Sequence, residues 1–229
     1  MAMSEKIIDL RNLLANRFPL PPRPAPTRLV TGLATFDQSI GHGLPKGAIT
    51  ELISPRGRAG SASLVHAFIR AAYRDQYFVA LIDGRDSFDP CAVANSILRQ
   101  LLWVRCTKTL EGVKAADLLL RDGNFPLVIV DLILNSPEEL RKISQTTWYR
   151  LQRLVESVPT ACLVLTQYEM VSSAQLKLVL ENSRTLETLE KQNAISQLRI
   201  VVKRSHLKSE IAPSLRYSAA SSSQQSAVS

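Results

Sequence analysis

Nearly continuous apolar runs recur along the middle of the chain, and stretches with apolar residues at helical spacing separate most of them. The runs are Ala48–Ile53, Tyr77–Asp83, Leu102–Cys106, Pro126–Ile133 and Ala161–Thr166. Such runs are typical of strands buried on both faces of a parallel sheet. Strands and helices in alternation therefore predict an α/β domain with a central, mostly parallel sheet flanked by helices.

Three of the intervening helices can be placed from their apolar positions. The helix after the second run has its apolar face at Val93, Ala94, Ile97, Leu98 and Leu101. Another lies around Glu111–Arg121, with Leu118 and Leu119 expected to point inward. A third begins at Ser136-Pro137-Glu138-Glu139, where a capping residue, an early proline and two acids define the first turn, and it continues to Val158.

The pattern changes toward both ends of the chain. Gln175–Glu181 and Gln197–Arg204 alternate apolar and polar residues, which predicts an antiparallel pair with one solvent-exposed face, joined by a long connection at Asn182–Asn193. The Ser-, Ala- and Gln-rich segment 209–229 is expected to be disordered. At the other end, residues 1–18 predict an amphipathic helix, and the proline-rich segment 19–27 predicts a stiff linker. The apolar face of this helix includes Ile7, Leu10 and Leu14. We expect the helix to dock through this face, either on the protein's own core or on another protein.

Composition limits the classes of function. The net charge of +8 favours nucleic acid or an acidic partner, although the basic residues are scattered. No apolar run approaches the roughly 20 residues that span a bilayer, and the N-terminus lacks a signal-peptide pattern, so we expect a cytoplasmic protein without a membrane partner. The three isolated cysteines are expected to be reduced core residues. The three histidines share no spacing with other ligand types, so no metal site is expected.

A glycine-bearing loop joins the first strand to an apolar helix that begins near Leu64, which is the setting of a phosphate-binding loop. The consensus sequence of such a loop is G-x-x-x-x-G-K-[ST], in which the lysine contacts the phosphates and the Ser or Thr hydroxyl binds Mg²⁺. Here Pro55 replaces the first glycine, Ser61 the lysine and Ala62 the hydroxyl residue, while Gly57 and Gly60 keep the loop flexible. Arg56 and Arg58 are the only cations within the loop.

Several segments together resemble the core of the RecA recombinase family. Thr31-Gly32-Leu33, Asp37 and G-H-G-L-P-K-G at 41–47 precede the loop, and Asp83-Gly84-Arg85-Asp86-Ser87-Phe88-Asp89-Pro90 resembles the family segment D-A-E-H-A-L-D-P. The resemblance implies that Asp131 stands where the family keeps a second metal-handling acid and that Gln167 stands where it senses the nucleotide. It spans roughly residues 28–205 and predicts a RecA-like core over 28–208.

The short chain and the closing pair that ends V-V-K-R are most similar to the ImuA group of RecA-like proteins. This resemblance implies a nucleoid-associated accessory role in damage-induced translesion DNA synthesis. It also implies contacts with an ImuB-type Y-family polymerase homologue, with RecA, or with an error-prone replicative-type polymerase. Self-association and direct DNA binding are left open by the sequence.

The departures from the family predict the loss of catalysis. Ser61 cannot supply the phosphate-binding charge, and Arg85 occupies the position of the family's water-activating glutamate. We therefore expect a pseudo-ATPase without a bound cofactor, in which Asp131 and Gln167 have only local roles. ATP binding through Gly57, Gly60 and the two loop arginines is the alternative, with Arg58 replacing the lysine in an active ATPase. A SulA-like inhibitor of cell division is a third reading.

The remaining candidates are contact residues. Arg199, Lys203, Arg204 and Lys208 form the densest basic patch, which is either a solvated strand face or a contact to DNA or a partner, and Arg56 and Arg85 are further contact candidates. Tyr168–Ser173 falls where a recombinase has a DNA-binding loop, but it is short and weakly charged. Trp103, Trp148 and Tyr149 are expected to be core or contact residues.

Overall fold

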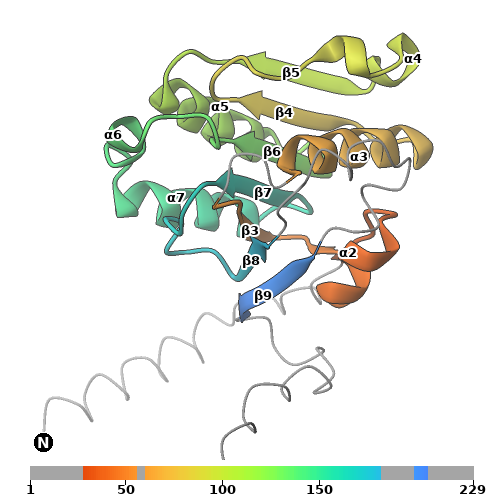
Figure 1. Ribbon diagram of the computed structural model, residues 1–229. Coiled ribbons are helices and arrows are strands. Elements are labelled where there is room, and N and C mark those ends of the chain that lie inside the picture. Colours follow the sequence, from red (N-terminus) through yellow and green to blue (C-terminus); the bar gives the residue numbers. More distant parts are fainter. Residues whose placement is uncertain (1–27, 56–59, 182–198, 206–229) are drawn as a thin grey trace, which may run out of the picture.

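The computed structural model describes residues 28–55, 60–181 and 199–205 (Figure 1). The predicted N-terminal helix with Ile7, Leu10 and Leu14, its linker, the connection at Asn182–Asn193 and the C-terminal tail lie outside the described residues. So do Arg56, Gly57 and Arg58 of the phosphate loop.

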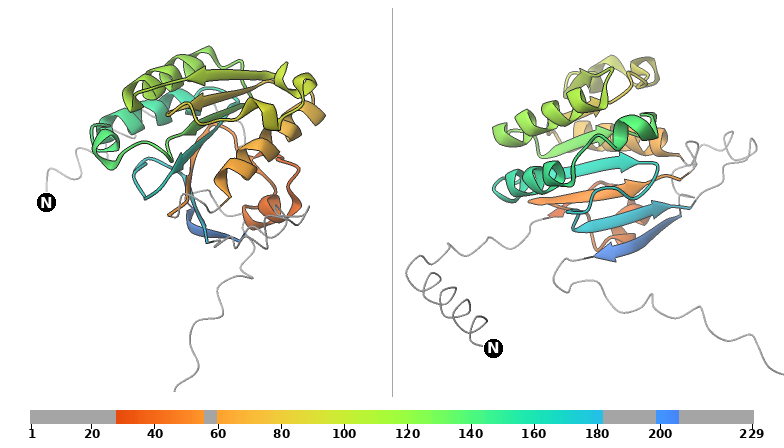
Figure 2. Two further views of the ribbon diagram at one scale, coloured as in Figure 1. Left: turned by 45° about the horizontal axis from the view of Figure 1, so that its top comes forward. Right: turned by 90° about the vertical axis from the view of Figure 1, so that its left-hand side faces the viewer.

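A seven-stranded sheet forms the centre of the molecule, in the order β5-β4-β6-β7-β3-β8-β9 (Figure 2). All neighbouring strands are parallel except β8 and β9, which confirms the predicted mostly parallel sheet with an antiparallel hairpin at its edge. Its strands are β3 (Ala48–Ile53), β4 (Val79–Asp83), β5 (Leu101–Arg105), β6 (Leu127–Asp131), β7 (Ala161–Thr166), β8 (Leu176–Leu180) and β9 (Ile200–Ser205). A separate two-stranded pair joins β1 (Arg28–Leu29) to β2 (Leu44–Pro45).

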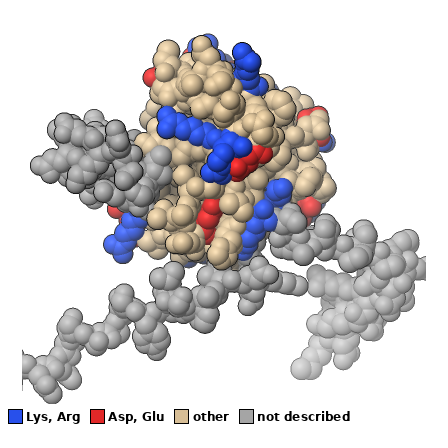
Figure 3. Space-filling view, turned by 90° about the vertical axis from the view of Figure 1, so that its right-hand side faces the viewer, with Lys and Arg blue, Asp and Glu red and all other residues tan. Residues whose placement is uncertain are grey.

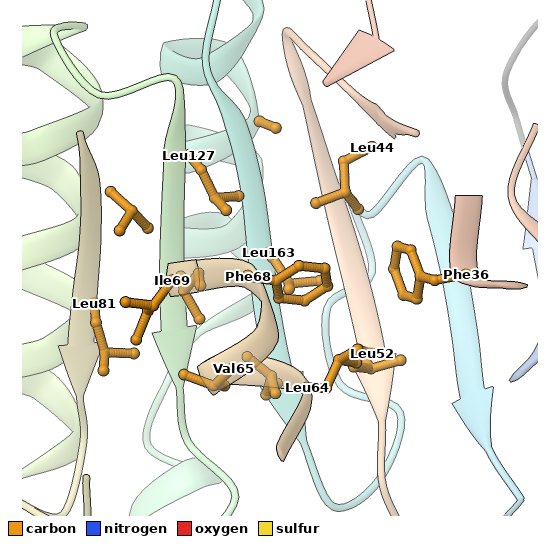
Figure 4. Packing of buried hydrophobic residues seen from close by; sticks show 14 of the residues in the cluster. Phe36, Leu44, Leu52, Leu64, Val65, Phe68, Ile69, Leu81, Leu127 and Leu163 are labelled. Atoms are coloured by element: carbon orange, nitrogen blue, oxygen red, sulfur yellow. The ribbon is translucent and has the colours of Figure 1, made fainter. Parts of the chain in front are cut away.

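Helices cover both faces of the sheet, as the alternation predicts. Helices α2 (Ala34–Ser39) and α3 (Ser61–Arg74) pack on one face, and α5 (Thr109–Asp122) and α7 (Gln145–Glu156) pack on the other (Figure 1). On the first face, α3 places Val65, Phe68 and Ile69 over the apolar side chains of the central strands (Figure 4). The ring of Phe36 meets Phe68 edge-on, with centroids 5.2 Å apart, which joins α2 to the same core.

Two predicted helices are shorter than their apolar patterns suggest. The segment after β4 forms only a 3₁₀ turn (Pro90–Ala92) and the one-turn α4 (Asn95–Leu98), and Leu101 already begins β5. The helix that Ser136 caps ends after one turn as α6 (Pro137–Leu140), although the side chain of Ser136 accepts the predicted hydrogen bond from the Glu139 N–H. A bend at 141–144 separates it from α7 because Ile143 and Trp148 both insert into the core.

Three sequence predictions about burial are wrong. Leu118 is 68% exposed because the core-facing stripe of α5 is formed by Thr109, Gly112, Val113, Ala116 and Leu120, which leaves Leu118 on the outer side. Cys91 is exposed, whereas Cys106 and Cys162 are buried as expected. The polar side of β8 is not in contact with solvent either, since Lys177 is only 2% exposed.

Among the described residues, no helix is long and apolar enough to cross a membrane.

Candidate functional site

The carboxyl ends of the parallel strands meet at one edge of the sheet, which is where open α/β sheets bind ligands. The loops that leave β3 and β7 pass to opposite faces of the sheet, since α3 packs on the first face and Val171 packs with α7 on the second. Strands β3 and β7 are neighbours, so the topological switch point lies between them. The candidate site is therefore the end of β3, with the ends of β4, β6 and β7 beside it.

The start of α3 keeps the backbone geometry of an anion-binding loop but not its side chains. Gly60 has a φ of 92°, a left-handed conformation that favours glycine, and it precedes the first helical residue. Ser61 is buried and Ala62 is exposed, and no side chain caps the helix. Pro55 is exposed at the other end of the loop. This helix start can offer N–H groups to an anion, but Ser61 and Ala62 bring neither an ammonium group nor the expected metal-binding hydroxyl.

Asp83, at the end of β4, is fully occupied in shaping the loop that follows it. Its buried carboxylate accepts hydrogen bonds from the Phe88 N–H at 2.7 Å, the Ser87 hydroxyl at 3.2 Å and the Trp103 indole N–H at 3.3 Å. The Phe88 ring in turn stacks on His66 of α3, with centroids 5.1 Å apart. Burial lowers the pKa of His66, and no group of three or more potential metal ligands occurs within the described ranges.

The two residues after Gly84 make contacts with the chain around β5 and α5. The guanidinium of Arg85 donates to the Thr107 carbonyl oxygen at 3.2 Å, on the side of α5. Asp86 has a φ of 54° and forms a bidentate ion pair with Arg105, with N–O distances of 2.6 and 2.5 Å. The hydrogen bonds from Arg105 lower the pKa of Asp86, so this carboxylate is a weak base. Both side chains are therefore engaged in local structure.

Asp131 and Gln167 converge on one short loop. Asp131 lies opposite Asp83 in the sheet, and its Oδ1 accepts the N–H of Ile133 at 3.0 Å. Burial raises the pKa of Asp131 to about 6, and the charge of Asp83 acts in the same direction, against the hydrogen bond from Ile133. The side chain of Gln167 donates to the Ile133 carbonyl oxygen at 2.5 Å. Both predicted site residues therefore fix the turn after β6.

Sequence reasoning missed Asn135, which joins the loops after β4 and β6. Its buried amide donates to the Gly84 carbonyl oxygen at 3.0 Å and to the Thr109 hydroxyl at 2.9 Å. A Cβ atom on Gly84 would lie 2.3 Å from Asn135 Oδ1, so the contact requires glycine at that position. An asparagine in a loop carries no sequence signal for such a role.

Sequence reasoning also missed Glu51, although a glutamate inside the apolar run Ala48–Ile53 was a usable signal. The side chain of Glu51 is fully buried on β3, and Oε1 accepts the N–H groups of Met170 at 2.7 Å and Val171 at 3.0 Å. Lys177 of β8 places its Nζ 3.1 Å from Glu51 Oε2 and 2.9 Å from Glu169 Oε1. The segment Tyr168–Ser173, which falls where a recombinase has a DNA-binding loop, is thus fastened to the strand that enters the phosphate loop.

The predicted basic patch is paired with acids. Lys203 forms an ion pair with Glu169, and Arg199 forms one with Glu181 at 3.3 Å. Hydrogen bonds from Lys203 and Lys177 lower the pKa of Glu169 to about 2. Arg204 follows Lys203 on β9, and Lys208 lies outside the described residues. On the face drawn in Figure 3, Lys and Arg side chains lie beside Asp and Glu and form no continuous basic surface.

The aromatic candidates occupy three different environments. Trp148 is 1% exposed and belongs to the core between α7 and the sheet, and Trp103 is partly buried with its N–H on Asp83. Tyr149 is 54% exposed, so it is a surface residue.

Part of the chain is similar in sequence to RecA proteins. The chain is 30% identical over 105 residues to the RecA protein of Nostoc sp. (strain PCC 7120), a match that covers 45% of this chain and 29% of that protein. It is 32% identical over 113 residues to the RecA protein of Clavibacter michiganensis and 29% identical over 113 residues to that of Leifsonia xyli. The fold is RecA-like. The matched segment spans less than a third of each of these RecA proteins, and no protein-family model matches the chain.

Proposed function

We propose that this chain is a non-catalytic, RecA-like accessory protein of damage-induced translesion DNA synthesis that acts through contacts with other proteins. The observation that carries the proposal is a RecA-like core in which the residues at the ends of β4 and β7 are engaged in local structure. Arg85 is bonded to Thr107, Asp83 shapes its own loop, and Gln167 is held by Ile133.

Phosphoryl transfer depends on positioned charge, which this site lacks at two positions. A lysine and the Mg²⁺ ion that a hydroxyl residue holds normally neutralise the transferred phosphate, and Ser61 and Ala62 supply neither the ammonium group nor the metal-binding hydroxyl at these positions. A general base must also reach the attacking water, and the positions after Gly84 hold an arginine and an ion-paired aspartate. These substitutions support loss of turnover more strongly than loss of anion binding, because backbone N–H groups remain at the start of α3.

The ATPase alternative is tested by calorimetry and by phosphate release with ATP and Mg²⁺. We expect no phosphate release above the buffer blank. Arg58→Ala is the diagnostic variant, and Arg199→Ala is its matched control because Arg199 pairs with Glu181 next to the edge strand β9. The ATPase alternative would replace the proposal if the chain bound ATP with micromolar affinity and hydrolysed it, and if Arg58→Ala but not Arg199→Ala abolished the hydrolysis.

The partner is tested by co-purification with an ImuB-type polymerase homologue, an error-prone replicative-type polymerase and RecA. We expect at least one of these to bind, and the N-terminal helix to contribute through its apolar face. The double variant Leu10→Asp with Leu14→Asp should weaken capture, whereas Asn12→Asp, on the predicted polar side, should not. Capture of a tubulin-like division protein instead would favour the SulA-like reading, and capture of none would refute the accessory role.

A further inference from the structure

The connection Gln167–Gln175, which we call the strap, runs back along β3 from the carboxyl end of that strand to Ile49 near its start, where the Gln175 N–H donates to the Ile49 carbonyl oxygen at 3.0 Å. It joins β7 to β8, and β3 lies between these two strands in the sheet. The strap must therefore pass over the strand that enters the phosphate loop. Its residues Val171 and Ala174 are buried against the α7 side of the core.

Glu51 holds the strap by accepting hydrogen bonds from the strap's backbone N–H groups. One carboxylate oxygen accepts the consecutive N–H groups of Met170 and Val171, and the hydroxyl of Thr166 donates to the same atom at 3.3 Å. Hydrogen bonds from backbone N–H groups to an ionised carboxylate are stronger than those between neutral groups. The closed position of the strap thus depends on a charged group inside the sheet.

An alternating row of charges connects Glu51 to the surface. Lys177, only 2% exposed, lies between Glu51 and Glu169, and Lys203 contacts Glu169 from β9. Glu169 belongs to the strap and is 39% exposed, so it is the one member of the row that is both on the strap and reachable by solvent. Its low pKa of about 2 agrees with two ammonium groups around one carboxylate.

The strap is held unevenly along its length. In its second half, the Ser173 hydroxyl donates to the Trp148 carbonyl oxygen at 2.9 Å, the Gln175 N–H donates to the Ile49 carbonyl oxygen at 3.0 Å, and Ala174 is buried. The Tyr168 hydroxyl, the Ser172 hydroxyl and Gln175 Oε1 are buried without a hydrogen-bond partner among the described residues, and such groups destabilise the conformation that buries them. The first half of the strap is therefore the part that Glu51 and Glu169 hold.

We propose that the first half of the strap is a locally opening cover on β3 and that Glu169 is its latch. When Glu169 leaves Lys177 and Lys203, the strap loses its outer attachment, and Gln167, at its first position, is freed to leave Ile133. Opening then changes the surface beside the phosphate loop while the strands stay folded. The inference does not depend on which partner the protein binds.

Hydrogen exchange of the full chain, followed by mass spectrometry, tests the latch. In Glu169→Gln, peptides that contain the Met170 and Val171 amides should exchange about fivefold faster than in the wild type, the effect expected for loss of one partly exposed ion pair. Glu181→Gln is the matched control, because it removes the partly exposed pair with Arg199 and leaves Lys177 untouched. Raising the salt concentration should speed strap exchange in the wild type and change it little in Glu169→Gln.

Two results would overturn the inference. Strap exchange in Glu169→Gln that equals the wild-type rate would show that Glu169 does not hold the strap. Equal acceleration across β6, β7 and the strap would show global destabilisation instead of local opening. The milder variant Lys203→Gln provides an independent check, since it removes only the outer partner of Glu169 and should accelerate the same peptides to a smaller extent.

Discussion

Replacing Lys177 with methionine tests how far the buried charges stabilise the sheet. Methionine keeps the length of the side chain and removes its charge, so Glu51 stays buried without its cation. Breaking a buried ion pair in this way costs about 3–5 kcal/mol because the remaining charge is uncompensated. The hydrogen bonds from Thr166, Met170 and Val171 still reach Glu51, so we expect the lower end, about 3 kcal/mol of unfolding free energy.

The measurement is urea unfolding, with thermal unfolding as a second probe. For a domain of this size, about 3 kcal/mol corresponds to a fall in Tm on the order of 10 °C. Lys203→Met is the control: Lys203 is 53% exposed, and an exposed pair contributes only about 0–1 kcal/mol. The double variant Glu51→Gln with Lys177→Met should recover part of the loss, since no charge is then left buried. A loss below about 1 kcal/mol in Lys177→Met, or equal losses in the two lysine variants, would refute the reasoning.

Three further predictions concern the site and the core. Gly84→Ala should lower the unfolding midpoint because its Cβ would lie 2.3 Å from Asn135 Oδ1, whereas Gly112→Ala, whose nearest contact is 3.4 Å, should leave the midpoint unchanged or raise it; equal effects would contradict this packing. The folded-state pKa of Asp131, about 6, lies above its usual 3.8, so its protonation stabilises the fold at acid pH and this contribution is lost between about pH 4 and 6. Urea midpoints at several pH values should therefore show Asp131→Asn gaining stability relative to the wild type as pH rises through that window, and parallel curves would disprove the shift. Thiol titration with a disulfide reagent should modify Cys91 rapidly and the other two cysteines only after denaturation, and more than one fast thiol would show that the core is open.

Parts of the fold could be predicted because their cause is local. The bounds of β3 and β7 match the predicted runs Ala48–Ile53 and Ala161–Thr166, since a strand buried on both faces is apolar at most positions. Ser136 caps a helix through its own side chain, so its role can be read from neighbouring residues. The length of that helix could not be read, because the bend after Leu140 arises from packing of distant elements.

The phosphate loop likewise has some features that the sequence predicts and others that only the structure shows. That Ser61, Ala62 and Arg85 differ from the lysine, the hydroxyl residue and the glutamate of an active phosphate-binding site can be read from the sequence alone. The sequence did not indicate the direction of the Arg85 side chain or the hydrogen bond from Gln167 to Ile133. Both depend on loops that the sheet brings together.

The sequence by itself determined the alternation of strands and helices and the departures of the loop from the phosphate-loop consensus, because both follow from residue types over short stretches. Only the tertiary structure decided that Glu51, Glu169 and Lys177 share one charged row. Glu51 is distant in sequence from the other two residues and meets them because β8 lies beside β3, with the strap running along β3. Leu118 shows the same limit of sequence reasoning. Its helical spacing is compatible with either side of α5 facing the core, and only the position of the sheet determines which side is buried.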